Sequence, residues 1–156
     1  NNSSPQNRYR LMWMDVTYQP GTLKVIAFDK EGNQVAEKEI KTAGKPYQLV
    51  LDADRKHLLD DGKDISFITA SVIDKQGNPC PTAINDLSFE VEGAGIYRAA
   101  CNGDATSLEP FHLPKMKLFS GKLVVLVQST YETGEIKLIV KGNGLKTAEV
   151  IIEATN

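Results

Sequence analysis

The chain has 156 residues, of which 41% are hydrophobic and 24% charged, and its formal net charge is −2. This balance gives no electrostatic reason to expect nucleic acid or an anionic membrane as a partner. No run of 18 apolar residues is present, so the sequence predicts no transmembrane helix. The start, Asn-Asn-Ser-Ser-Pro, has no Met and no signal-like segment, and we interpret the chain as a piece of a longer protein.

The first part of the chain has the pattern of a short β-meander. Residues 1–8 are polar, and we expect them to be disordered. Strand-like runs follow at residues 9–18, 22–29 and 34–42, separated by the turn signals Pro20-Gly21 and Gly32-Asn33. The sequence therefore predicts three strands within residues 9–44, which is near the lower limit for independent stability. This piece looks like half a domain.

The second part, residues 45–156, is predicted to be a larger β domain organised around one long strand. A boundary is expected at 43–46, and residues 47–53 then alternate as a first strand. The long strand, residues 65–73, lies between two turn signals. Its apolar residues fall on both faces, with Ile65, Phe67 and Ile73 on one and Ile68, Ala70 and Val72 on the other. A strand covered on both sides is typical of the middle of a sandwich.

The remaining strands are expected at 87–91, 96–100, 122–129, 135–141 and 145–154. The run at 122–129 is nearly continuously apolar, which predicts a second central strand. In the last strand Ala148, Val150, Ile152 and Ala154 should face inward. Residues 102–117 are predicted to form one long loop, of the kind that is often functional or packed as an Ω-loop. Seven strands without a convincing helix indicate an all-β, immunoglobulin-like (invasin-like) sandwich.

The sequence contains no recognisable catalytic motif, and we predict no catalytic, cofactor-binding or metal-binding residues. His57 and His112 have no partner at metal-ligand spacing, and there is no nucleophile elbow or P-loop. The acidic run at 60–64 could hold a calcium ion, but turn capping is the better interpretation. Cys80 and Cys101 are expected to be two free, partly buried thiols, with one disulfide as the alternative.

Sugar binding would need a different set of residues. A glycosidase site requires two acids held close together in a cleft, whereas the predicted inward faces here are apolar. Four tyrosines are the candidates for a sugar-stacking platform: Tyr9, Tyr18, Tyr97 and Tyr131. They fall on different strands and in both parts of the chain, so ordinary edge positions are the simpler interpretation.

Several segments resemble glycoside hydrolase family 2. Residues 11–28, Leu-Met-Trp-Met-Asp-Val-Thr-Tyr-Gln-Pro-Gly-Thr-Leu-Lys-Val-Ile-Ala-Phe, look like the W-x-V-x-Y-x-P-G-T-L strand pair of these enzymes. Lys41-Thr42-Ala43-Gly44 is similar to the T-A-G segment that follows it. Residues 51–55 and 61–68 resemble the opening of the C-terminal immunoglobulin-like domain of the family's β-galactosidases. Residues 102–111 and Phe119-Ser120-Gly121-Lys122 match later landmarks of that domain.

This resemblance implies a non-catalytic, C-terminal accessory region of an exported enzyme of β-galactosidase type, as found in Bacteroides. The expected location is periplasmic, secreted or at the cell surface. The parent would be a retaining glycoside hydrolase whose two catalytic glutamates lie in an upstream TIM barrel and have no counterpart here. The sandwich would pack on that catalytic barrel or support it.

The resemblance also implies that residues 9–44 are a truncated immunoglobulin-like domain. We therefore expect residues 9–42 either to self-associate or to pack against residues 47–156. Two alternative functions remain at this point. One is a carbohydrate-binding module. The other is a bacterial surface adhesion module, because residues 70–78 share the style of invasin-type repeats.

Overall fold

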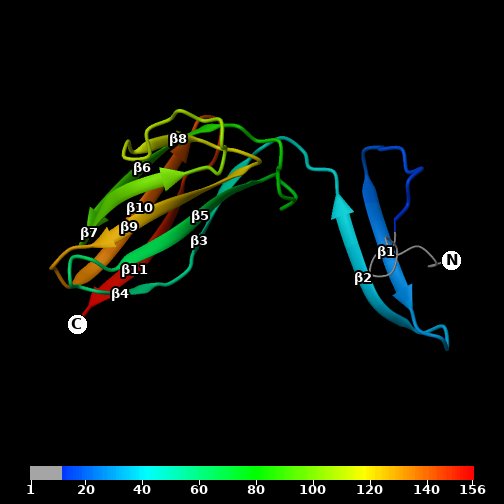
Figure 1. Cartoon of the computed structure of the whole chain (residues 1–156), viewed down its shortest axis with the longest axis horizontal. Helices are drawn as coiled ribbons and strands as arrows, with labels where there is room; N and C mark the ends of the chain where they lie inside the picture. Colours follow the sequence, from blue (N-terminus) through cyan, green and yellow to red (C-terminus); the bar gives the residue numbers. More distant parts are fainter. Residues whose placement is uncertain (1–11) are drawn as a thin grey trace. The chain divides into compact units, whose positions relative to one another are not determined.

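The structure is a computed structural model that describes residues 12–156, all of them in strands, turns and loops (Figure 1). The chain divides into two compact units, and the division falls after Thr42. Each unit is described by itself below. Within residues 12–156 there is no helix that could cross a membrane. The expected disorder of residues 1–8 lies outside the described residues.

The first unit is a β-hairpin. Strand β1 (Thr22–Phe28) pairs antiparallel with β2 (Gln34–Lys41), with a bulge near Phe28. The turn between them uses Gly32 at a φ of 87°, and the Asn33 amide donates to the Asp29 carboxylate at 2.8 Å. Glycine is needed there because other residues rarely adopt a positive φ.

The prediction of a three-stranded meander is wrong for the described residues. Residues 12–18 form no strand, and residues 9–11 of the expected first strand lie outside the described part of the chain. A run of strand-favouring residues becomes a strand only when a neighbouring strand accepts its hydrogen bonds. Among the described residues β1 has one such neighbour, β2.

The second unit is a two-sheet sandwich, as predicted (Figure 1). The four-stranded sheet is fully antiparallel and has the spatial order β3 (Gln48–Ala53), β5 (Ile65–Ile73), β9 (Lys122–Ser129) and β7 (Gly95–Cys101). The five-stranded sheet has the order β4 (His57–Leu59), β11 (Ala148–Thr155), β10 (Gly134–Gly142), β6 (Asp86–Gly93) and β8 (Lys115–Lys117). Its pairs are antiparallel except β4 with β11.

The seven strands expected in this unit are all present, and β5 and β9 are the two central strands of their sheet. The sequence did not predict β4 and β8. Each has three residues, which is too short for a periodic signal. Because β8 lies inside the expected loop 102–117, the actual connection is shorter and covers residues 102–114.

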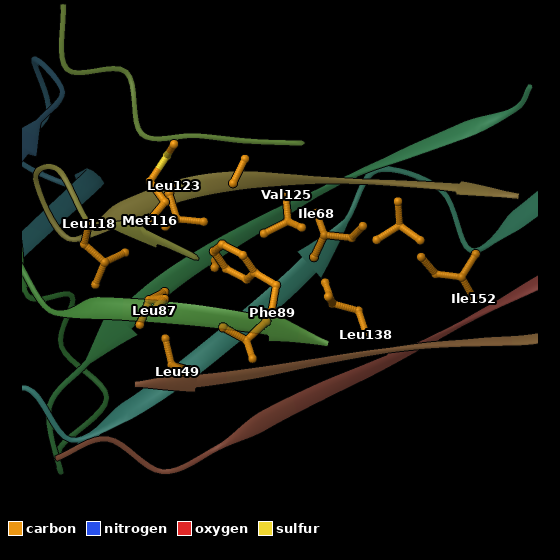
Figure 2. Close-up of a cluster of buried hydrophobic side chains, with 14 of the residues drawn as sticks. Leu49, Ile68, Leu87, Phe89, Met116, Leu118, Leu123, Val125, Leu138 and Ile152 are labelled. Carbon is orange, nitrogen blue, oxygen red and sulfur yellow. The ribbon is translucent and has the colours of Figure 1, made fainter. Parts of the chain in front are cut away.

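The core lies between the two sheets and follows from the alternation of the strands. Figure 2 shows side chains from both sheets pointing into this space. The buried apolar residues labelled there are Leu49, Ile68, Leu87, Phe89, Met116, Leu118, Leu123, Val125, Leu138 and Ile152. The inward positions predicted for the last strand are confirmed, since Ile152 and Ala154 are buried, Ala148 and Val150 are half-buried and Glu149 and Glu153 are exposed.

Strand β5 differs from its prediction on one face. Its even-numbered residues, such as Ile68 and Ala70, are fully buried in the core. On the other face Phe67 is 46% exposed, and its neighbours Ile65 and Ile73 are half-buried. The expectation that both faces are covered is therefore wrong for the described residues. The sandwich has two layers, so each sheet has one face against the core and one that points outward.

The turn before β9 is a tight one. Phe119 and Lys122 exchange backbone hydrogen bonds, and the two residues between them, Ser120 and Gly121, have φ values of 51° and 73°. Two successive positive φ values are typical of a type I′ turn. A Cβ at Gly121 would lie 2.2 Å from the Cys80 carbonyl oxygen, so this position requires glycine.

Candidate functional site

The acidic run at 60–64 caps a turn. The Asp61 carboxylate accepts the backbone N–H groups of Lys63 and Asp64 at 2.8 and 2.9 Å. These bonds, led by that from Lys63, lower the pKa of Asp61. Asp64 in turn accepts from the Leu59 amide and from the Arg55 guanidinium, both at 3.0 Å. Within residues 12–156 no group of three or more His, Cys, Asp or Glu side chains is placed to hold a metal ion.

Asp74 makes the densest set of hydrogen bonds to a carboxylate in the sandwich. It lies just after β5, is 2% exposed, and accepts from the amides of Gln76 and Asn78 within its own turn. It also accepts from the distant Gly44 amide at 2.7 Å and from the Asn78 side chain at 3.0 Å. The Gly44 bond, followed by that from the Asn78 side chain, lowers the pKa of Asp74 to about 2. The sequence predicted the turn but not the bond to Gly44.

The histidines and cysteines form no site. His57 is exposed, with Nδ1 3.4 Å from a Glu153 carboxylate oxygen. His112 is exposed in the loop before β8, so the two histidines lie toward opposite edges of the five-stranded sheet. Cys80 and Cys101 are both free thiols, and the disulfide alternative is wrong for this structure. Cys80 is buried, which raises its pKa, whereas Cys101 is exposed.

The considered tyrosine platform does not assemble among the described residues. Tyr97 lies on the edge strand β7, as expected, but it is half-buried, and its ring stacks on Phe89 across the sandwich, with centroids 5.7 Å apart and planes 9° apart. Burial raises the pKa of Tyr97 to about 12. Tyr131 is 79% exposed, but Tyr18 belongs to the other compact unit and Tyr9 lies outside the described residues.

The loop 102–114 is fixed to the strands on either side of it. The Tyr97 hydroxyl is shared between the carbonyl oxygens of Phe111 and Leu113, at 2.9 and 2.7 Å. The Asn102 side chain donates to the Lys117 carbonyl, and the Ala100 amide donates to Phe111. The loop is therefore held in place by hydrogen bonds, although Leu108 in its middle is 95% exposed.

The outer face of the five-stranded sheet is charged. Lys137 and Lys141 point outward from β10 and form ion pairs with Glu149 on β11 and Glu90 on β6, at 2.8 and 3.0 Å. The hydrogen bond to Glu149 raises the pKa of Lys137. Exposed pairs of this kind contribute little to stability, because solvent screens the charges. This face has the composition of a solvated surface.

The outer face of the four-stranded sheet is different. Three neighbouring strands, β5, β9 and β7, carry uncharged side chains at the paired outward positions of three consecutive cross-strand rows, and the exposed Arg98 takes the bulge position of β7 beside Ala99. We call the apolar members of these rows the apolar patch: Ile65, Phe67, Ile96, Ala99, Val124 and Leu126. Thr69, Cys101 and Gln128 lie among them. The register pairs Phe67 with Leu126 and Leu126 with Ala99, so the patch is continuous across the three strands.

The hairpin of the first unit shows the same division between its two faces. Register places Leu23, Val25, Ala27, Ala36 and Ile40 on one face, with Lys38 as its charged member. The other face carries Lys24, Glu37, Glu39 and Lys41 together with Thr22 and Ile26, and it has ion pairs of 2.9 Å between Lys24 and Glu37 and between Lys41 and Glu39. An apolar face on a two-stranded hairpin is typical of a strand pair taken from a larger β domain.

Several of the segments that carried the family resemblance fix turns and loops of the sandwich: Asp61-Gly62 at the capped turn, Asn102 to Phe111 in the fixed loop, and Ser120-Gly121 in the tight turn before β9. Comparison with known proteins agrees with the resemblance. Residues 49–151 match the family model of the glycoside hydrolase family 2 C-terminal domain 5. This chain belongs to glycoside hydrolase family 2. Residues 1–36 match a second model, that of a domain of unknown function (DUF4982).

Individual members of the family are much longer than this family 2 chain. The β-galactosidase BoGH2A of Bacteroides ovatus is 45% identical over 139 residues, which are 89% of this chain and 16% of that protein. A β-glucuronidase of Formosa agariphila is 28% identical over 156 residues, 98% of this chain and again 16% of that protein. A crystal structure of a family 2 member from Bacteroides cellulosilyticus matches with a TM-score of 0.87 and 29% identity, covering 96% of this chain and 20% of that one. The chain thus corresponds to a small part of its relatives.

Proposed function

We propose that the chain is a non-catalytic C-terminal accessory region of an exported family 2 enzyme that cleaves β-galactosides. Membership of the family supports a glycoside hydrolase as the parent. The 45% identity to a Bacteroides ovatus β-galactosidase favours galactosides over the glucuronides of the more distant relative. In this proposal the role of residues 43–156 is structural. They pack on the catalytic barrel of the parent or support it.

The observation that carries the proposal is the use that the sandwich makes of its carboxylates. A retaining glycosidase needs two carboxyl groups about 5–5.5 Å apart, beside a cleft that admits the sugar. In the described sandwich Asp61, Asp64 and Asp74 accept backbone N–H groups at turns. Glu90 and Glu149 form ion pairs on a flat outer sheet face. These acids therefore serve folding and solvation, which favours a catalytic site elsewhere in the parent.

The first unit is part of the same proposal. Its hairpin would belong to a second β domain of the parent, and the match of residues 1–36 to a separate family model supports two domains rather than one. In the isolated 156-residue chain, we expect two copies to associate through residues 9–42 and so to cover this apolar face.

Activity on a chromogenic β-galactoside tests the proposal directly. The 156-residue chain and the full parent enzyme would be assayed side by side at equal molar concentration. We expect turnover by the parent and none by the 156-residue chain, because the chain contributes no nucleophile or acid. A parent whose predicted barrel glutamate is changed to Gln gives the matched inactive control.

Turnover by the 156-residue chain would overturn the non-catalytic role. A parent that hydrolyses β-glucuronides but not β-galactosides would overturn the substrate class while leaving the accessory role in place. A parent enzyme that ends before Ala43, and so lacks the sandwich, tests whether the sandwich has a structural role or is dispensable. We expect it to lose thermal stability, because the surface that the sandwich covers becomes exposed.

A further inference from the structure

We propose that the apolar patch on the outer face of the β3-β5-β9-β7 sheet is the surface through which the sandwich packs onto another domain of its own parent chain. The inference rests on the proposed function, and it adds which face makes the contact. Four lines of argument support it: the sequence of the strands, the contrast between the two outer faces, the size of the patch, and the way in which the chain enters this sheet.

The two central strands carry the sequence of strands that are covered on both sides. Strand β9 contains five consecutive apolar residues, from Leu123 to Val127. Alternating strands with one solvated face have polar residues at every second position, whereas strands covered on both faces show continuous apolar runs. The sandwich buries Leu123, Val125 and Val127. It leaves Val124 and Leu126 on the outer face, where nothing within residues 43–156 covers them completely.

The opposite sheet is the internal comparison. Its central strand β10 alternates apolar inward residues with an outer face that carries Glu135, Lys137 and Lys141 and one apolar residue, Ile139. The three rows of the apolar patch contain no such paired charges, so the two outer faces differ in how densely they are charged. Clustered apolar residues on a surface mark an interaction site, while single exposed ones need no explanation. Ile151 is 46% exposed, like Phe67, but its cross-strand partner is Lys137, which forms an ion pair with Glu149 on the same face.

The size of the patch favours a tethered domain over a second copy of the chain. Three strands and three cross-strand rows cover on the order of 300 Å². A stable complex of separate proteins buries about 800 Å² on each partner. A contact within one chain requires less area, because the connecting segment keeps the two surfaces at an effective concentration of the order of millimolar. The relatives supply such a partner, since this chain covers 16% of their length.

The chain also enters the sandwich at the sheet that carries the apolar patch. β3 is the first strand of the unit and forms an edge of the same sheet that carries the patch. The entry is fixed by the hydrogen bond from the Gly44 amide to Asp74 and by that from the Tyr47 amide to the Ile73 carbonyl oxygen, at 2.7 and 2.9 Å. The segment through which the chain enters the sandwich is thus hydrogen-bonded to the edge of this sheet.

Cys101 is a built-in reporter for this surface. It is an exposed free thiol at the end of β7, and the register places it opposite Val124, in the same cross-strand row. Cys80 is buried and serves as the internal reference. Alkylation by iodoacetamide would be followed by peptide mass spectrometry in the 156-residue chain and in the full parent. We expect Cys101 to react at least about tenfold more slowly in the parent.

A matched pair of substitutions tests the patch itself. Phe67→Lys places a charge in the middle of the patch, and Ile151→Lys makes the same change at an equally exposed position on the charged sheet. In the parent, Phe67→Lys should restore fast labelling of Cys101, and Ile151→Lys should leave the protection intact. Circular dichroism of both variants checks that the sandwich remains folded, and the comparison of the two wild-type chains stands without either variant.

Equal labelling rates in the 156-residue chain and the parent would overturn the proposal. Protection already present in the 156-residue chain would also overturn it. If that protection grows with protein concentration and light scattering shows a dimer, the occupant is a second copy. Neither result bears on the galactosidase assay. Failure of this inference is therefore distinguishable from failure of the proposed function.

Discussion

Single side chains fix the loops of this sandwich to its strands. Asp74 is the clearest example, because one buried carboxylate accepts four hydrogen bonds and one of them comes from Gly44, thirty positions earlier. Aspartate is common in turns because its side chain bonds to nearby backbone amides. The sequence therefore indicated the local bonds of Asp74. The bond to Gly44 depends on the pairing of β3 with β5, which no local pattern reveals.

We expect Asp74→Asn to destabilise the sandwich at neutral pH. The amide keeps one acceptor oxygen, but its NH₂ group would face N–H donors that now bond to the second carboxylate oxygen. Because the folded-state pKa of Asp74 lies near 2, below its value in the unfolded chain, its contribution is present above about pH 4 and is lost as the pH falls through 2. Urea unfolding at pH 7, 4, 3 and 2 measures this.

The difference in unfolding free energy between wild type and Asp74→Asn should shrink as the pH falls from 4 to 2. The exposed carboxylate Asp86 provides the control, since Asp86→Asn should leave the unfolding free energy at pH 7 nearly unchanged. A constant difference between wild type and Asp74→Asn over the whole range would show that the charge of Asp74 is not what stabilises the turn.

At the scale of elements, the long strands were predictable and the short ones were not. Strands β5, β9, β10 and β11 each have eight or nine residues with a clear period, and turn residues mark their ends. Strands β4 and β8 have three residues each, and they form because each pairs with a longer neighbouring strand, β4 with β11 and β8 with β6. The same dependence on a neighbour explains why the run at 12–18 forms no strand.

Only part of the apolar patch could be predicted from the sequence. The apolar runs of β5 and β9 correctly indicated that both faces of these strands are apolar. They could not show that the sandwich buries only one of the two faces. Tyr97 was misjudged for a related reason. Tyr97 pairs with the buried Val127 and points inward, and a bulge after it, with Arg98 in the extra position, turns Ala99 and Cys101 to the outer face instead.

We expect Tyr97→Phe to release the loop 102–114. The substitution keeps the ring stacked on Phe89 but removes the hydroxyl that bonds to Phe111 and Leu113. The cost should be about 1–2 kcal/mol in unfolding free energy, because two carbonyl oxygens lose a shared donor. Hydrogen exchange in the loop should become faster. Tyr131→Phe, at an exposed tyrosine, is the control and should change neither measurement.

At the scale of the whole molecule, the buried core belongs to one of the two units. All the buried apolar residues of the described chain lie between Leu49 and Ala154. The hairpin of the first unit buries none of its strand residues. Whether residues 9–42 associate with a second chain or with residues 47–156 stays a prediction, and light scattering combined with limited proteolysis tests it. A monomer that is readily cleaved within residues 9–42 would contradict both forms.

Residues 43–156 should fold without residues 1–42. Cutting before Ala43 keeps Gly44 and its bond to Asp74 and leaves the core complete. We expect a single cooperative transition in urea with an unfolding free energy of about 5–15 kcal/mol, as is usual for a domain of this size. Residues 1–42 alone should show no such transition, because an isolated two-stranded hairpin is marginally stable. A broad, non-cooperative transition for residues 43–156 would contradict this division.

The pairing of β4 with β11 has a consequence for synthesis on the ribosome. Leu58, from the start of the sandwich sequence, lies beside Ala154, from its end, and β11 also supplies the neighbour of β10. Until residues 148–155 have left the exit tunnel, β10 has an open edge and the apolar side chains opposite Ile152 remain in contact with water. Translation therefore produces the domain in an unclosed form, and only its last strand completes the layer.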